Sequence, residues 1–186
     1  MSRIDKIDFT ATNVLVFVTV VAYFIQTSIS YGDWLFGLNL GFLVYGFYWQ
    51  PLTSIFSHGG IFHLAMNMFV LWQFGNLIEK ARGGKRFLLL YFIAGILTSI
   101  FSFFYIFFVD ININLVGASG AICAILGYVA YFDSYQRKSI LTWIVFISLA
   151  PLLINLPIAW FAHFIGAAIG FIYAIIEKKF FNRRYY

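Results

Sequence analysis

The chain has 186 residues, of which 62% are hydrophobic and 10% charged, and its mean hydropathy is +0.89. Soluble domains carry about 25% charged residues, so this composition excludes a water-soluble globule and predicts a protein of the lipid bilayer. The single cysteine excludes an intramolecular disulfide. The net charge of +5 would also suit a nucleic-acid partner, but no basic helix face or long basic tail accompanies it.

Six stretches of the sequence are apolar enough to form membrane-spanning helices, for which about 20 residues are needed. In chain order they are roughly residues 11–30, 61–78, 87–108, 117–132, 140–155 and 158–176. The first follows a short basic start, but its apolar part is longer than a signal-peptide core and no small-residue cleavage site follows it. The predicted fold class is therefore all-α, a polytopic membrane protein that forms one domain over residues 1–186.

The basic residues test this arrangement, because cytoplasmic loops of membrane proteins carry an excess of Lys and Arg. With six spans and a cytoplasmic N-terminus, all twelve fall on the cytoplasmic side and none on the other. They form four groups: Arg3 and Lys6; Lys80, Arg82, Lys85 and Arg86; Arg137 and Lys138; and Lys178, Lys179, Arg183 and Arg184. The basic charge is therefore interpreted as a topology signal, with both termini cytoplasmic and no nucleic acid bound.

Strongly polar side chains are few within the predicted spans, and such residues tend to mark function in a membrane. Ser119 and His163 each lie fourteen residues before the cytoplasmic end of a span, which places both about 21 Å from that end. His63 and Asn67 share one face of the second span, at about 24 and 18 Å, and His58 stands at its mouth. The polar side chains of three spans thus lie in one layer, which predicts a shared site.

The fourth predicted span is unusually short. Residues 117–132 cover only about 24 Å, less than a hydrocarbon core of about 30 Å, so residues 110–116 must dip inward. We expect Ser119 at the N-terminus of a helix, on the floor of a water-filled depression, where free N–H groups face developing negative charge. Small residues at helical spacing on two spans predict the close contact that would bring His163 to Ser119. These stripes are Gly120, Ala124 and Gly127, and Ala162, Gly166 and Gly170.

This layer has the residue types that acyl transfer needs. A serine is a poor nucleophile until a base takes its proton, and His163 is the candidate base at the depth of Ser119. The Ser119 N–H, the Asn67 amide and the His63 ring could stabilise an oxyanion. No carboxylate lies within the spans to orient the histidine, so we predict a Ser–His dyad and not a triad.

Two other uses of the layer stay open on the residues alone. Three histidines could bind zinc, although the sequence has no HExxH motif. An intramembrane histidine could also belong to a proton or ion transporter. Such a path would need polar residues toward the cytoplasmic side, where the second, fourth and sixth spans are nearly apolar.

In its motifs the chain resembles the rhomboid family of intramembrane serine proteases, over essentially its whole length. "GASG" matches the family's GxSG motif around Ser119, and "AHFIGAAIG" matches AHxxGxxxG with His163 as the base. "HGGIFHLAMNM" reproduces the HxxxxHxxxN pattern of the second span. "YWQPLTSIFSHGG" is similar to the end of the first loop, and "LIEKARGGKRFLLLYFIAG" to the second connection, with Glu79 in the usual acidic position.

The resemblance implies a six-transmembrane-helix rhomboid bundle of the compact bacterial type, with a short fourth helix and a membrane-embedded first loop. It implies that the protein, in the bacterial cytoplasmic (inner) membrane, hydrolyses peptide bonds in or near transmembrane segments of other membrane proteins. These substrates would enter laterally from the lipid, past the fifth span and the loop before the sixth, and no cofactor or metal would be needed. The residues implied in stabilising the oxyanion or the substrate are His58, His63, Asn67 and Gly117.

Two positions depart from the family pattern. Cys123 stands where an aromatic residue often packs under the catalytic imidazole, and Gln50 replaces an arginine of the first loop, which we expect to loosen that loop. The remaining alternative within the family is a non-enzymatic, rhomboid-like pseudoprotease that binds membrane clients. Such relatives usually lack the serine or the histidine, and this chain has both.

Overall fold

The computed structural model describes residues 9–154 and 158–182, and every regular element within these ranges is helical. The elements are α1 (Ala11–Ser28), α2 (Gly32–Phe36), α3 (Gly41–Val44), α4 (Gln50–Thr53), α5 (Ile61–Arg82), α6 (Gly84–Phe108), α7 (Ser119–Phe132), α8 (Arg137–Leu149), the 3₁₀ helix η1 (Ala150–Ile154) and α9 (Trp160–Asn182). Four of the basic residues used above (Arg3, Lys6, Arg183 and Arg184) and the predicted end of the fifth span at Asn155 lie outside the described residues.

Among the described residues, five helical segments are long and apolar enough to cross a membrane: α1, α5, α6, α8 together with η1, and α9. The sixth, α7, is a shorter apolar helix of 14 residues, which span about 21 Å. It begins at Ser119 and not at 117, and α9 begins at Trp160 and not at 158. The chain is thus an integral membrane protein with five candidate spans, and α7 is the expected short fourth helix.

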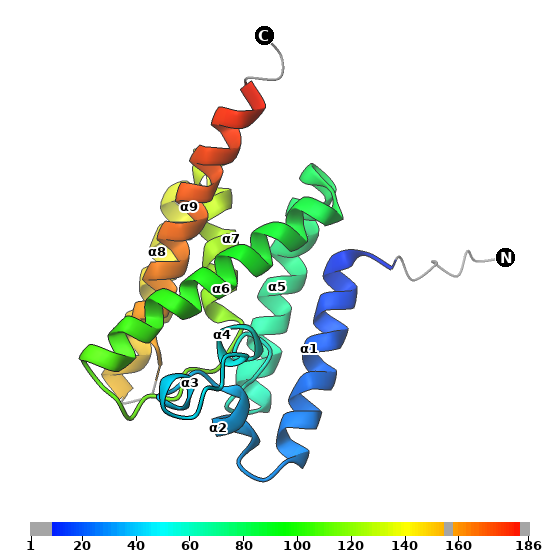
Figure 1. Ribbon diagram of the computed structural model, residues 1–186. Coiled ribbons are helices and arrows are strands. Elements are labelled where there is room, and N and C mark those ends of the chain that lie inside the picture. Colours follow the sequence, from blue (N-terminus) through cyan, green and yellow to red (C-terminus); the bar gives the residue numbers. More distant parts are fainter. Residues whose placement is uncertain (1–8, 155–157, 183–186) are drawn as a thin grey trace, which may run out of the picture.

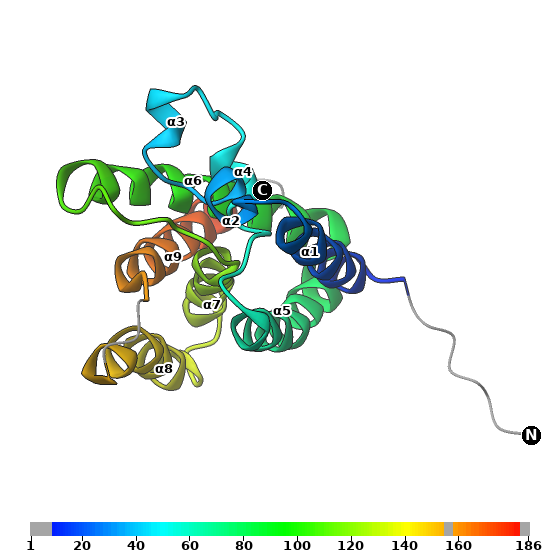
Figure 2. The ribbon, with the colours of Figure 1, turned by 90° about the horizontal axis from the view of Figure 1, so that it is seen from below.

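The short helix α7 lies in the centre of the bundle. Figure 2 shows it among α5, α6, α8 and α9, with α1 beyond α5 on the outside. All residues from Gly120 to Ala130 are buried. A helix that is apolar on every side is suited to a protein interior or to lipid; α7 contains no charged residue and is placed in the interior.

The contact between α7 and α9 is made by glycines. Gly166 and Gly170 lie against the backbone carbonyls of Gly120 and Ala124, and Gly127 lies against the carbonyl of Ala167. A Cβ atom at any of these three glycines would overlap main-chain atoms of the facing helix. The predicted small-residue stripes are therefore confirmed, and they bring the two backbones together as such stripes do in lipid.

At the opposite end of the bundle from α2–α4, α5 holds the start of α1 (Figure 1). Glu79 accepts hydrogen bonds from the backbone N–H groups of Ala11 and Thr12, at 2.7 and 2.8 Å, and from the Thr12 hydroxyl at 2.7 Å. The N-terminus of a helix has unpaired N–H groups and a partial positive charge, so a carboxylate stabilises it. Glu79 thereby fixes α1 to the end of α5.

The basic residues of the described chain gather at this same end. The Arg82 guanidinium lies over the Phe132 ring, 4.6 Å from its centroid, and the Lys178 ammonium lies 5.5 Å from the centroid of Tyr131. The ends of α5, α7 and α9 therefore meet here, which places basic residues of three helices at one end of the bundle.

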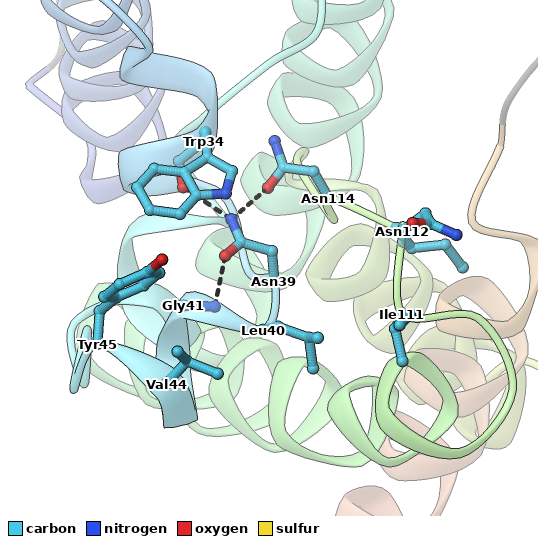
Figure 3. Close-up of a pocket in the computed structure, with 10 residues that line it drawn as sticks. Trp34, Asn39, Leu40, Gly41, Val44, Tyr45, Ile111, Asn112 and Asn114 are labelled. Atoms are coloured by element: carbon cyan, nitrogen blue, oxygen red, sulfur yellow. Dashed lines mark hydrogen bonds between the residues drawn. The ribbon is translucent and has the colours of Figure 1, made fainter.

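The connection between α1 and α5 contains the short helices α2, α3 and α4 and is tied to the segment before α7. Leu38 and Leu115 exchange two backbone hydrogen bonds of 2.8 Å in an isolated β-bridge. Beside this bridge, a cavity of about 360 Å³ lies between the first loop and residues 111–114. Figure 3 shows the Asn39 amide at its wall, bonded to the Trp34 carbonyl, to Gly41 and to Asn114.

Gln50 makes several hydrogen bonds within the first loop, and its expected loosening of the loop relative to an arginine stays a prediction. The side chain is fully buried and accepts a hydrogen bond from the backbone N–H of Asn39 at 3.3 Å. It donates to the carbonyl of Trp34 at 3.2 Å and to the Asn39 side chain at 3.4 Å. A neutral amide can donate and accept at once, so Gln50 connects both halves of the loop.

Candidate active site

Ser119 and His163 are in direct contact. The Oγ of Ser119, the first residue of α7, lies 3.0 Å from the Nε2 of His163 in α9. The serine is half-buried, whereas His163 is only 5% exposed. The predicted proximity of the two residues is confirmed, and the distance is that of a hydrogen bond between a nucleophile and its base.

The turn before α7 has a backbone shape that requires glycine. Gly117 has φ +125°, and its N–H donates to the carbonyl of Ser54 at 2.9 Å. A Cβ atom there would lie 2.7 Å from the His63 Cε1 atom, 2.9 Å from its Nε2 and 3.6 Å from the Asn67 Nδ2. The turn therefore brings the backbone beside Ser119 against His63 and Asn67, two polar side chains of α5.

Asn67 carries an unpaired donor. The residue is 7% exposed, and its Nδ2 atom has no hydrogen-bond partner among the described residues. A buried amide without a partner costs about 1–3 kcal/mol, so native proteins rarely retain one without a use. Here the amide lies beside the turn that precedes Ser119, 3.6 Å from the position of a Cβ atom at Gly117.

His58 lies against the turn that precedes α7, and its side chain is buried, with 1% exposed. Its Nδ1 lies 3.1 Å from the carbonyl of Phe56, which can only accept, so Nδ1 carries the hydrogen. Its Nε2 then accepts the N–H of Ala118 at 3.5 Å, and its ring lies 5.2 Å from that of His63. The backbone of His58 is held by Gln26 of α1, which donates to its carbonyl at 3.0 Å and accepts its N–H at 2.9 Å.

Ser148 and Gln26 are two buried polar residues near the site that were not predicted from the sequence. Ser148 of α8 contacts the other ring nitrogen of His163, with an Oγ–Nδ1 distance of 3.0 Å. It lies eleven residues after Arg137, about 16 Å along the helix, so its approximate depth was available from the sequence. A serine inside an apolar helix is too common for that depth alone to single it out. Gln26 lay at the predicted end of the first span and had no motif around it.

Two further predictions from the sequence concerned Cys123 and a metal site. Cys123 is fully buried one turn after Ser119, and no described aromatic ring stacks on that of His163, which fits the departure noted at this position. Within residues 9–154 and 158–182, no group of three His, Cys, Asp or Glu side chains is placed to hold a metal ion.

Comparison with known proteins gives the family. A family model described as Rhomboid domain matches residues 45–180. The chain is 40% identical to "Rhomboid protease GluP" of Bacillus subtilis (strain 168) over 111 residues, which are 60% of this chain and 21% of that protein. It is 31% identical to "Putative rhomboid protease YdcA" of the same organism over 163 residues, which are 82% of this chain and 78% of that protein.

A similarity to a plant protein is more limited. "RHOMBOID-like protein 4" of Arabidopsis thaliana is 35% identical over 136 residues, which are 69% of this chain and 34% of that protein. The chain thus spans about a fifth of GluP and a third of the plant protein. The family match covers both Ser119 and His163, with their contact, and most of the helical bundle. This chain belongs to the rhomboid family.

Proposed function

We propose that this protein is an intramembrane serine endopeptidase in which Ser119 is the nucleophile and His163 the general base. The observation that carries the proposal is the 3.0 Å contact between Ser119 Oγ and His163 Nε2. Its place next to the unpaired amide of Asn67 adds weight, since a nucleophile, a base and an oxyanion donor are the three parts of acyl transfer. Two bacterial relatives also bear the name of rhomboid protease.

The reaction would proceed in two steps. Ser119 Oγ attacks the carbonyl carbon of the scissile peptide bond while His163 Nε2 takes the hydroxyl proton. The tetrahedral intermediate collapses to an acyl-enzyme, and His163 gives that proton to the leaving amine. Water then attacks the ester with His163 again as the base, which releases the carboxylate product and restores the serine.

The negative charge of the intermediate would be stabilised by donors around Gly117. The Asn67 amide and the His63 ring come from α5, and the N–H of Ser119 is one of the free donors at the start of α7. Gly117 leaves the space in which they converge. His58 holds the N–H of Ala118 and so shapes the turn.

In the membrane, residues 1–186 would form a single rhomboid domain of six spans, of which α7 is the short fourth. The described basic residues then face the cytoplasm, as do both termini, in a bacterial inner membrane. Transmembrane proteins would be the substrates and would reach Ser119 laterally, past α8 and the segment before α9. No metal or other cofactor takes part in this mechanism.

Labelling with a fluorophosphonate probe tests the proposal, because the probe reacts with an activated serine. Detergent-purified wild type should be labelled, and Ser119→Ala and His163→Ala should not. Ser99→Ala is the matched control, because it removes a buried serine of α6 whose hydroxyl lies 3.4 Å from that of Ser54; it should be labelled like wild type. Folding of each variant is checked by its thermal unfolding transition.

Absence of labelling in folded wild-type protein would contradict the proposal and favour a non-enzymatic protein that binds membrane clients. Ion or proton flux into proteoliposomes that persists in Ser119→Ala would favour a transporter instead. Cleavage of a model transmembrane substrate by wild type, and by neither dyad variant, completes the positive case.

A further inference from the structure

We propose that Ser148 holds the His163 imidazole in the tautomer that a general base needs. The inference rests on the proposed function of the Ser119–His163 pair and adds a positioning residue to it. Ser148 is fully buried in α8, whereas His163 belongs to α9 and Ser119 to α7. Three helices therefore contribute to one chain of hydrogen bonds.

The Ser148 hydroxyl has two neighbours. Its Oγ lies 2.6 Å from the backbone carbonyl oxygen of Ile144, one helical turn earlier, and 3.0 Å from the Nδ1 atom of His163. Serine in a helix often donates to the carbonyl four residues before it. The shorter of the two contacts is the one to the carbonyl.

The number of hydrogens that each group carries decides which atom donates and which accepts. A hydroxyl group has one hydrogen to donate, and a carbonyl oxygen can only accept. The Ser148 hydrogen is therefore directed to Ile144, and its oxygen is left to accept from His163. The Nδ1 atom of His163 must then carry the ring hydrogen, because two acceptors would face each other otherwise.

The position of this hydrogen decides whether Nε2, on the opposite side of the His163 ring, can accept a proton. A neutral imidazole has one N–H group, so a hydrogen on Nδ1 leaves a free lone pair on Nε2. That atom lies 3.0 Å from the Ser119 Oγ and can accept its proton. With the other tautomer, Nε2 would itself carry a hydrogen and could not act as the base.

Ser148 takes the position that a carboxylate has in a Ser–His–Asp triad, where the acid fixes the tautomer and stabilises the imidazolium. A neutral hydroxyl can fix the tautomer and the ring orientation, but it adds no negative charge. Because Ser148 lies on α8, the base is correctly oriented only when α8 is packed beside α9.

Kinetics on two variants and a control test this role. Ser148→Ala should lower kcat for a transmembrane substrate by about tenfold, the value of one net hydrogen bond, with little change in KM. Ser148→Thr keeps the hydroxyl and should restore most of the rate. The matched control is Thr19→Val on α1, since Thr19 is also fully buried and donates to the carbonyl four residues earlier, at 2.8 Å; its kcat should stay at the wild-type value.

The tautomer can be measured directly by ¹⁵N NMR of histidine-labelled protein at neutral pH. The sequence has three histidines, so single substitutions assign the signals. Wild type should show a protonated Nδ1 and a bare Nε2 for His163, and Ser148→Ala should show a mixture of tautomers. This result does not depend on whether the Thr variant folds.

The two proposals fail in different ways. A wild-type His163 with its hydrogen on Nε2, or a Ser148→Ala variant with unchanged tautomer and unchanged kcat, would overturn the role of Ser148. Wild-type protein that has the expected tautomer, yet reacts with no fluorophosphonate and cleaves no substrate, would overturn the protease assignment while the structural role of Ser148 stands.

Discussion

Gly166 of α9 lies directly against the backbone carbonyl of Gly120 in α7, with no space between the helices for a methyl group. Gly120 follows Ser119, and Gly166 is one turn after His163. The distance between the proposed nucleophile and base is therefore set by a contact of two main chains. A backbone contact is stiffer than one between side chains, because no rotamer change can relieve it.

Gly166→Ala should separate α7 from α9 and abolish labelling by a fluorophosphonate. Overpacking of a tight contact costs about 1–3 kcal/mol, so the thermal unfolding transition should also fall. Gly60→Ala is the control, since no atom lies within 4 Å of a Cβ at that glycine, and it should behave as wild type. Wild-type labelling and stability in Gly166→Ala would show that the helices can move apart without harm.

Asn67→Ala should lower kcat by about 10²–10³, the usual loss when one oxyanion donor is removed. Its stability should change little, because the Nδ2 atom has no partner to lose among the described residues. Steady-state kinetics on a transmembrane substrate measures the effect. Asn76→Ala is a control on the same helix, where the amide donates to the Trp72 carbonyl at 2.7 Å and accepts from the Thr10 hydroxyl at 3.5 Å. An unchanged kcat in Asn67→Ala would remove this residue from the oxyanion site.

Glu79→Ala should destabilise the protein by about 1.5–3 kcal/mol, the range for a hydrogen bond to a charged group. The substitution leaves two backbone N–H groups at the start of α1 and the buried Thr12 hydroxyl without their acceptor. Thermal unfolding in detergent measures this loss. Asp110→Ala, in an exposed turn where the carboxylate bonds only to Asn112, should leave the transition unchanged. Equal transitions for the two variants would show that α1 docks without its carboxylate cap.

Gln50→Leu keeps the volume of the side chain and removes its hydrogen bonds. Because Gln50 is fully buried, the N–H of Asn39 and the carbonyl of Trp34 would lose a partner, at a cost of about 1–3 kcal/mol. We expect a lower unfolding temperature and faster proteolytic cutting between α1 and α5. Gln73→Leu, at an exposed position of α5, is the control. If the loop resists proteases as in wild type, Gln50 does not hold it.

Much of the helical framework followed from hydropathy alone. Each of the five candidate spans overlaps a predicted apolar stretch, although α5 continues to Arg82 and α9 begins at Trp160. Depth was also predictable, because a helix advances by a fixed rise per residue. Counting residues from the charged ends was enough to place Ser119 and His163 in one layer, and the structure brings them into contact.

The contacts of individual polar side chains were not predictable in this way. Ser148, Gln26 and Gln50 are all buried and bonded to residues far away in the sequence. For each of them the decisive information is the direction in which the side chain points, and that direction depends on how neighbouring helices and loops are rotated and packed.

The sequence by itself determined the membrane character, the order of the helices and the depth of the polar layer, since these depend on composition and on distance along each helix. Only the tertiary structure decided which side chains in that layer face one another. Depth is one coordinate, measured along the helix axis. The position of a side chain in the plane across the helices is set by the glycine contacts of α7 and α9 and by the position of α8. These contacts join residues that are distant in the sequence.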